Sequence, residues 1–144
     1  MSGLLACESE RVDQQPDQVV DEFIRRMRRV HGDPESARLA YDLLWSQAKS
    51  NLAERAKRAS AVSGTKVAPE EMIAPSRFAF GSLPWRSSAR ISGSWALVSI
   101  ESDRPGTPPH EVKCVTEEGR WRVALQLPPL PPIRKRSQES EPSD

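Results

Sequence analysis

The sequence predicts an α+β fold in which three N-terminal helices pack on a curved antiparallel sheet of about four strands. Up to Gly64, apolar residues recur at spacings of three and four, which is the period of an amphipathic helix. From residue 94 to residue 127 they recur at every second position, which is the period of a half-buried strand. Because the helical stretches come first and the strands follow without alternating, we expect the helices to cover one face of the sheet.

The first helix is predicted over residues 17–30, with Pro16 at its opening position. Val20, Phe23 and Ile24 follow the helical spacing and form part of its buried face. The opposite face carries four arginines between residues 25 and 29. Such a basic run is typical of a solvated helix face rather than of a binding patch.

A second helix is predicted to begin with Asp33 as its N-cap and Pro34 in its first turn, because a carboxylate there accepts hydrogen bonds from the free amides of the helix start. Tyr41 and Trp45 are four positions apart, so they are predicted to lie on one side of this helix. Two aromatic rings in this arrangement favour core or interface packing, and they are also candidates for lining a pocket. A third helix is predicted to run to about Val62, with Ser50 or Asn51 as its N-cap.

Strands are predicted at residues 77–80, 85–92, 94–101, 110–116 and 120–127. The stretch 94–101 is apolar at both odd and even positions, which predicts a central strand covered on both faces. In the last strand the alternation sends Trp121 inward and Arg120 and Arg122 outward. A short link containing Gly119 precedes it, as a tight hairpin requires.

Length and composition predict one domain with two tails. Residues 1–15 are predicted to be a disordered tether, 16–127 the cone-like domain and 128–144 a proline-rich disordered tail, since proline removes the ladder hydrogen bonds of a sheet. The chain has 21 lysines and arginines against 20 aspartates and glutamates, so it has no strong net field to attract nucleic acid. We therefore expect no nucleic-acid partner.

The chain contains two cysteines, Cys7 and Cys114, which are too few and too far apart for a disulfide framework or a metal motif. No metal and no cofactor is expected. No stretch is long and apolar enough to span a membrane. The run Leu4-Leu5-Ala6-Cys7 nevertheless has the pattern of a bacterial lipobox, in which the cysteine is acylated, although the charged and apolar regions of a signal peptide are missing before it. Cys7 is therefore the lipidation candidate. The alternatives are a frayed N-terminus with a free cysteine and a disulfide between Cys7 and Cys114. The expected location is the cell envelope if the true start lies upstream of Met1, and otherwise the cytoplasm.

Three segments carry a resemblance to a known superfamily. They are the opening Val19-Val20-Asp21-Glu22-Phe23-Ile24, the break Gly32-Asp33-Pro34, and the ending Glu117-Glu118-Gly119-Arg120-Trp121-Arg122-Val123. Over residues 16–127 the chain resembles the nuclear transport factor 2-like superfamily of cone-shaped α+β domains, and in particular its bacterial envelope lipoproteins. The resemblance implies either a small-molecule isomerase, dehydratase or cyclase, or an envelope protein without a known reaction.

The residues favour a non-catalytic, envelope-associated accessory domain that binds a small ligand or a protein through the cone cavity or the sheet face. A second copy of the chain, binding through the sheet, is one such partner. Aromatic and arginine side chains contribute most to interfaces. The candidates for the pocket or interface are Tyr41, Trp45, Trp85, Trp95, Arg86, Arg90, Arg120 and Arg122.

The alternative is a small-molecule acid-base enzyme with a pocket near Tyr41 and Asp42. We assign no catalytic residue, because no recognisable catalytic dyad or motif is present. His31 and His110 are predicted to lie at element ends and to be exposed. Cys114 alternates with Val112 and is predicted to be a small buried apolar residue.

Overall fold

The computed structural model describes residues 14–73, 85–102 and 105–133. The predicted fold class is confirmed, since three helices precede a four-stranded antiparallel sheet. The elements in order are α1 (Pro16–Arg28), α2 (Pro34–Asp42), α3 (Ser46–Ser63), the 3-10 helix η3 (Pro69–Met72), β1 (Trp85–Ser92), β2 (Trp95–Ser102), β3 (His110–Glu117) and β4 (Arg120–Val123). The strand predicted at residues 77–80 and the lipidation candidate Cys7 lie outside the described residues.

The sheet is an antiparallel meander in the order β1-β2-β3-β4. Glu118 and Gly119 form the turn between β3 and β4, both with positive φ angles of 55° and 76°, as a two-residue type I′ hairpin requires. β4 ends at Val123, whereas the period of two predicts a strand as far as residue 127. A short stretch from α2 to α3 extends the sheet beside β4, because the amide of Val123 donates to the Leu43 carbonyl at 2.8 Å and the amide of Trp45 to the Val123 carbonyl at 3.0 Å.

Helix α1 lies against the sheet and supplies much of the core. Its apolar face is almost fully buried, and it packs on the inner face of β1, β2 and β4. Trp121 is only 9% exposed and belongs to this core, which agrees with its predicted inward direction. The core residues of α1 are Val19, Val20, Phe23, Ile24 and Met27.

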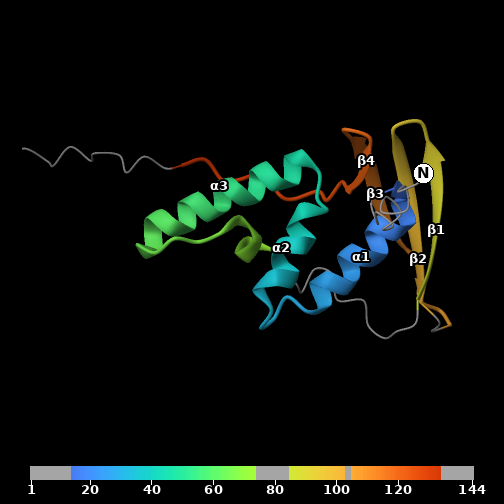
Figure 1. Ribbon diagram of the computed structural model, residues 1–144, viewed down its shortest axis with the longest axis horizontal. Coiled ribbons are helices and arrows are strands. Elements are labelled where there is room, and N and C mark those ends of the chain that lie inside the picture. Colours follow the sequence, from blue (N-terminus) through green and yellow to red (C-terminus); the bar gives the residue numbers. More distant parts are fainter. Residues whose placement is uncertain (1–13, 74–84, 103–104, 134–144) are drawn as a thin grey trace, which may run out of the picture.

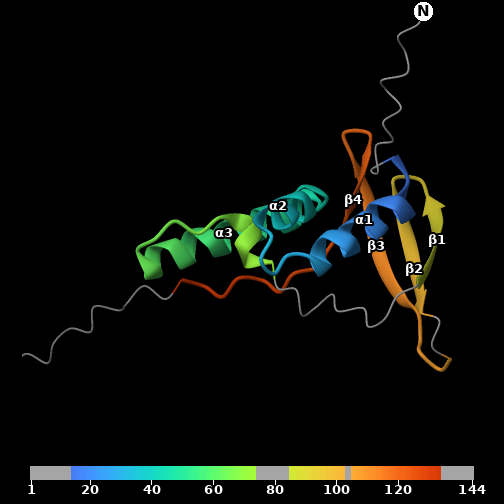
Figure 2. The ribbon, with the colours of Figure 1, turned by 60° about the horizontal axis from the view of Figure 1, so that its bottom comes forward.

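β2 differs from its prediction, because the structure buries only one of its faces. Ala96, Val98 and Ile100 are buried, whereas Trp95 is 41% exposed. The physical reason is that α1 covers a single side of the sheet, and no described helix lies on the other side (Figures 1 and 2). Burial of one face is the usual condition of an antiparallel meander.

The other two helices extend away from the sheet, as Figures 1 and 2 show, with α2 beside α1 and α3 reaching to the far end of the molecule. α2 ends at Asp42 and α3 begins at Ser46, so the prediction that Tyr41 and Trp45 share one helix is wrong. The early start of α3 has a tertiary cause. The Glu117 carboxylate accepts hydrogen bonds from the Ser46 amide at 3.0 and 3.1 Å and from its hydroxyl at 2.7 Å.

After β4 the chain continues as an extended segment along α3 (Figure 1). Arg55 Nη2 donates to the Pro128 carbonyl at 2.7 Å, and Asn51 Nδ2 donates to the same oxygen at 3.2 Å. Arg58 Nη1 donates to the Pro131 carbonyl at 2.5 Å. Pro128 and Pro131 therefore contact α3 through their backbone carbonyls.

Candidate functional site

Five of the predicted site residues lie on the face of the sheet that points away from α1, which we call the outer face. Strand register fixes this, because side chains alternate and directly paired residues share a face. Arg86 pairs with Glu101 and Arg90 with Leu97 between β1 and β2. Trp95 pairs with Val115, which pairs in turn with Arg122. The outer-face candidates are Trp95, Arg86, Arg90, Arg120 and Arg122.

The outer face has an apolar centre and a charged surround. Trp95, Leu97 and Val115 are neighbours across β2 and β3, and Trp95 is the most exposed of the large aromatic residues described. Lys113 pairs with Leu97 at the margin of this centre. A shallow hollow of about 220 Å³ opens next to it and is lined by Ser88, Arg90, Leu97, Ser99 and Glu111. The same face carries the acids Glu101, Glu111 and Glu117 beside the arginines. An exposed aromatic residue on a face with arginines is typical of an interaction surface.

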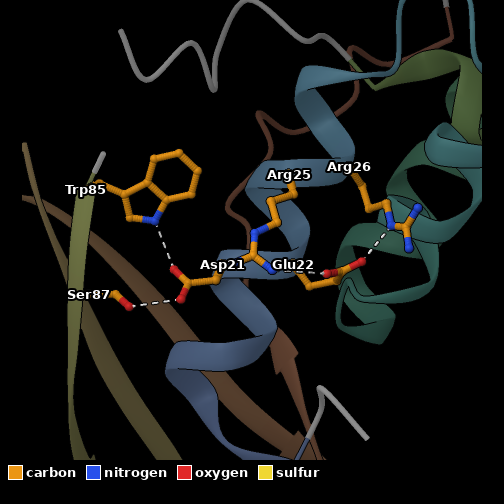
Figure 3. A network of polar contacts seen from close by, with 6 residues as sticks. All are labelled: Asp21, Glu22, Arg25, Arg26, Trp85 and Ser87. Carbon is orange, nitrogen blue, oxygen red and sulfur yellow. Dashed lines mark hydrogen bonds and ion pairs between the residues drawn. The ribbon is translucent and has the colours of Figure 1, made fainter. Parts of the chain in front are cut away.

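Trp85 does not join the outer face, because its position in β1 points it toward α1. Its indole Nε1 donates to Asp21 Oδ1 at 3.0 Å, and the Ser87 hydroxyl donates to Asp21 Oδ2 at 3.2 Å (Figure 3). The Arg28 guanidinium carbon lies 5.7 Å from the centroid of the Trp85 ring, within cation–π range. Trp85 therefore joins α1 to the start of β1.

A groove of about 720 Å³ lies at this junction, and we call it the α1–β1 groove. Both of its carboxylates have partners (Figure 3). Asp21 accepts the two hydrogen bonds from β1, and Glu22 forms ion pairs with Arg26 Nε at 2.6 Å and Arg25 Nη1 at 3.9 Å. Four arginines against two acids leave the lining net positive. The lining residues are Asp21, Glu22, Arg25, Arg26, Arg28, Arg29 and Trp85. The arginine run thus forms one wall of a groove, which its helical spacing alone did not indicate.

Tyr41 and Asp42 are not brought together as an acid-base pair. The Tyr41 hydroxyl donates to the Lys49 carbonyl at 3.3 Å, and Asp42 is exposed at the end of α2. Burial, with smaller contributions from the charges of Glu70 and Asp42, raises the pKa of Tyr41. The hydroxyl is therefore a protonated donor to the backbone and ties α2 to α3.

Trp45 has a similar structural role at the start of α3. Its Nε1 donates to the Leu125 carbonyl at 2.9 Å, which fixes the chain that leaves β4. A shallow hollow of about 170 Å³ touches this ring, and its other lining residues come from α3 and residues 125–127.

Cys114 is buried in the core, with its Sγ 3.9 Å from the Pro16 carbonyl oxygen. Burial raises its pKa to about 12, so the thiol is protonated and unreactive in the folded chain. Within the described ranges no three histidine, cysteine, aspartate or glutamate side chains are placed to hold a metal ion. No helix in these same ranges is long and apolar enough to cross a membrane.

Comparison with known proteins leaves the family of the chain open. No protein-family model matches the sequence, and neither the curated proteins nor the solved structures contain a match. The resemblance to the nuclear transport factor 2-like superfamily therefore stays a prediction. The observed fold supports only the assignment to the α+β class.

Proposed function

We propose that this chain is a non-catalytic accessory domain that binds a protein partner through the outer face of its sheet. The observation that carries this proposal is the exposed ring of Trp95, at the β1–β2 hairpin end of a face that no described helix covers. Tryptophan and arginine dominate the energetics of protein interfaces, and both are gathered here. The inner face is filled by α1 and core side chains, which favours the outer face over a cone cavity.

The composition of the outer face supports a protein rather than a small ligand. Its hollow of about 220 Å³ is smaller than the usual range of small-molecule sites, which begins at about 300 Å³. Its apolar centre is surrounded by Arg90, Lys113 and Arg122, an arrangement that matches the apolar core and polar rim of a protein interface. A second copy of the chain is one partner of this kind.

Substitution of Trp95 tests the proposal. Affinity capture from the native source is compared between the unmodified chain, Trp95→Ser and the control Val62→Ser, which removes a 90% exposed apolar side chain on α3. We expect one stoichiometric partner whose affinity falls at least about tenfold in Trp95→Ser and stays unchanged in Val62→Ser. Light scattering of the purified chain identifies a second copy as that partner. Equal capture by all three chains would exclude the outer face.

The location proposed for this activity is the cell envelope, with a lipid anchor at Cys7. The lipobox-like run from Leu4 to Cys7 and the polar residues after it support the anchor. A lipid anchor with two or more acyl chains holds a protein firmly at a membrane, since each buried CH₂ adds about 0.8 kcal/mol to the free energy of membrane binding. The genomic sequence upstream of Met1 tests this part, and an in-frame stop codon directly before Met1 would exclude it.

A further inference from the structure

The described sheet has two unlike edges. On one side, the chain from Leu43 to Trp45 bonds to Val123 and covers the short strand β4. On the other side stands β1, an eight-residue strand with β2 as its single neighbour among the described strands. A long edge strand presents a row of backbone donors and acceptors to an incoming strand.

The hydrogen bonds of the sheet show which β1 residues present those groups. The Thr116 amide donates to the Ser94 carbonyl, so Ser94 faces β3, and the next residue, Trp95, faces β1. Trp95 pairs with Ser92, and each second pair along the two strands is bonded in the same way. The intervening residues of β1 direct their amides and carbonyls to the edge. They are Trp85, Ser87, Ala89 and Ile91.

Both sides of this edge are basic. On the outer face, β1 carries Arg86 and Arg90; Glu101 pairs directly with Arg86, and Glu111 of β3 lines the same hollow as Arg90. On the other side the α1–β1 groove adds the exposed Arg28 and Arg29. An incoming strand with carboxylates would meet complementary charge, which speeds association and fixes register.

The same edge also offers an apolar contact on its helix-facing side. Ile91 is 55% exposed there, and Ala89 is packed at the margin of the core. A strand that alternates acidic and apolar side chains would place its acids beside Arg86 and Arg90 and its apolar residues beside Ala89 and Ile91.

From this arrangement we infer that β1 accepts an added strand from a partner protein, supplied by an extended segment in which acidic and apolar residues alternate. The backbone hydrogen bonds of β1 supply affinity in this mode, and the alternating side chains supply specificity. This site goes beyond the outer-face proposal, since its main contacts are the edge-directed backbone groups of β1, although it shares Arg86 and Arg90 with the outer face.

Charge argues against a second copy of β1 as the added strand. An antiparallel pair of β1 strands that keeps both helix-facing sides together places arginines from the two copies opposite or diagonal to each other. Like charges at such positions are destabilising.

A synthetic peptide tests the inference with the full chain. The probe is a capped peptide of alternating glutamate and valine as long as β1, and the control probe has lysine in place of glutamate. Binding is measured by fluorescence anisotropy at low and high salt. We expect the glutamate peptide to bind, the lysine peptide not to bind, and added salt to weaken the complex.

Three variants locate the site. Ala89→Pro removes an edge-directed amide of β1 and should abolish binding of the glutamate peptide. An edge strand tolerates proline at such a position, and circular dichroism checks that the variant is folded. Arg90→Glu should weaken binding at least about tenfold, and Arg38→Glu, a change at an exposed arginine of α2, should leave it unchanged. Trp95→Ser should also leave it unchanged, which separates this site from the outer face.

Amide hydrogen exchange of the unmodified chain, measured with and without the peptide, locates the site without any variant. The bound peptide should protect the amides of Ser87, Ala89 and Ile91 and leave those of Ser88 and Arg90, already directed to β2, as they were. The inference is overturned if the glutamate peptide fails to bind, if both peptides bind equally, or if the protection falls elsewhere.

Discussion

At the scale of single residues, Asp21 connects the helical and sheet parts of the molecule. Its two carboxylate oxygens accept hydrogen bonds from Trp85 and Ser87, so one side chain of α1 fixes two residues of β1 (Figure 3). Hydrogen bonds to a charged group contribute about 1.5–3 kcal/mol each, more than neutral ones. Asp21 therefore sets the position of β1 relative to the arginine-rich face of α1.

Cys114 predicts a pH dependence of stability. In the unfolded chain the thiol has its ordinary pKa of 9.0, and in the folded chain burial raises the pKa to about 12. The folded state therefore keeps its proton where the unfolded state loses it, so this stabilisation is complete below pH 9 and is lost as the pH rises toward 12. Between pH 8 and pH 10 we expect the free energy of unfolding to fall by about 1.4 kcal/mol from this group.

Urea unfolding at the two pH values measures this change, and Cys114→Ala is the comparison. The variant should be less stable at both pH values because it leaves a small cavity, but the part of the pH dependence due to the thiol should disappear. An equal loss of stability in the two proteins would show that Cys114 ionises in the folded state as it does in the unfolded one.

Side-chain direction is the part of the candidate site that the sequence predicts best. A strand alternates strictly, so the period of two places Arg86 and Arg90 on one face and Trp121 on the other, as the structure shows. The α1–β1 groove does not follow from the sequence. It depends on α1 lying beside the first residue of β1, and no local spacing encodes that contact between residues 64 positions apart.

At the scale of elements, the helix boundaries show where local reasoning ends. Asp33 caps α2 as predicted, with its carboxylate accepting from the Ser36 amide at 3.4 Å and hydroxyl at 2.6 Å, and these bonds lower the pKa of Asp33. α3 starts earlier than predicted because its capping carboxylate, Glu117, comes from β3, 71 residues away. A cap that arrives from another element cannot be read from neighbouring residues.

Glu117→Ala should therefore weaken the start of α3. The variant leaves the Ser46 amide without its partner and removes a negative charge from the positive end of the helix dipole. We expect a loss of about 1 kcal/mol in the free energy of unfolding and faster exchange of the first amides of α3. The matched control is Glu118→Ala at the adjacent exposed turn residue. Unchanged exchange at Ser46–Lys49 in Glu117→Ala would contradict the capping role.

At the scale of the whole molecule, the structure has a packed end and an extended end. The sheet and α1 hold most of the core, whereas α3 projects from it and packs on η3 (Figure 2). Three helices before a sheet could be predicted, since periodicity identifies the elements. Their relative placement could not, because Leu52 and Ala56 bury a narrow stripe that does not say which element covers it.

The extended segment after β4 should stabilise α3 through the carbonyls of Pro128 and Pro131. Proline has no amide to donate, but its carbonyl still accepts hydrogen bonds. The restricted φ keeps the segment extended, so that Arg55 and Arg58 reach carbonyls three residues apart. Replacing both arginines by alanine should lower the free energy of unfolding by about 1–3 kcal/mol and speed amide exchange along α3. The matched control is Lys57→Ala, which removes an exposed cation from the same helix and contacts neither carbonyl. If Lys57→Ala costs as much as the double substitution, the effect arises from helix charge and the segment does not hold α3.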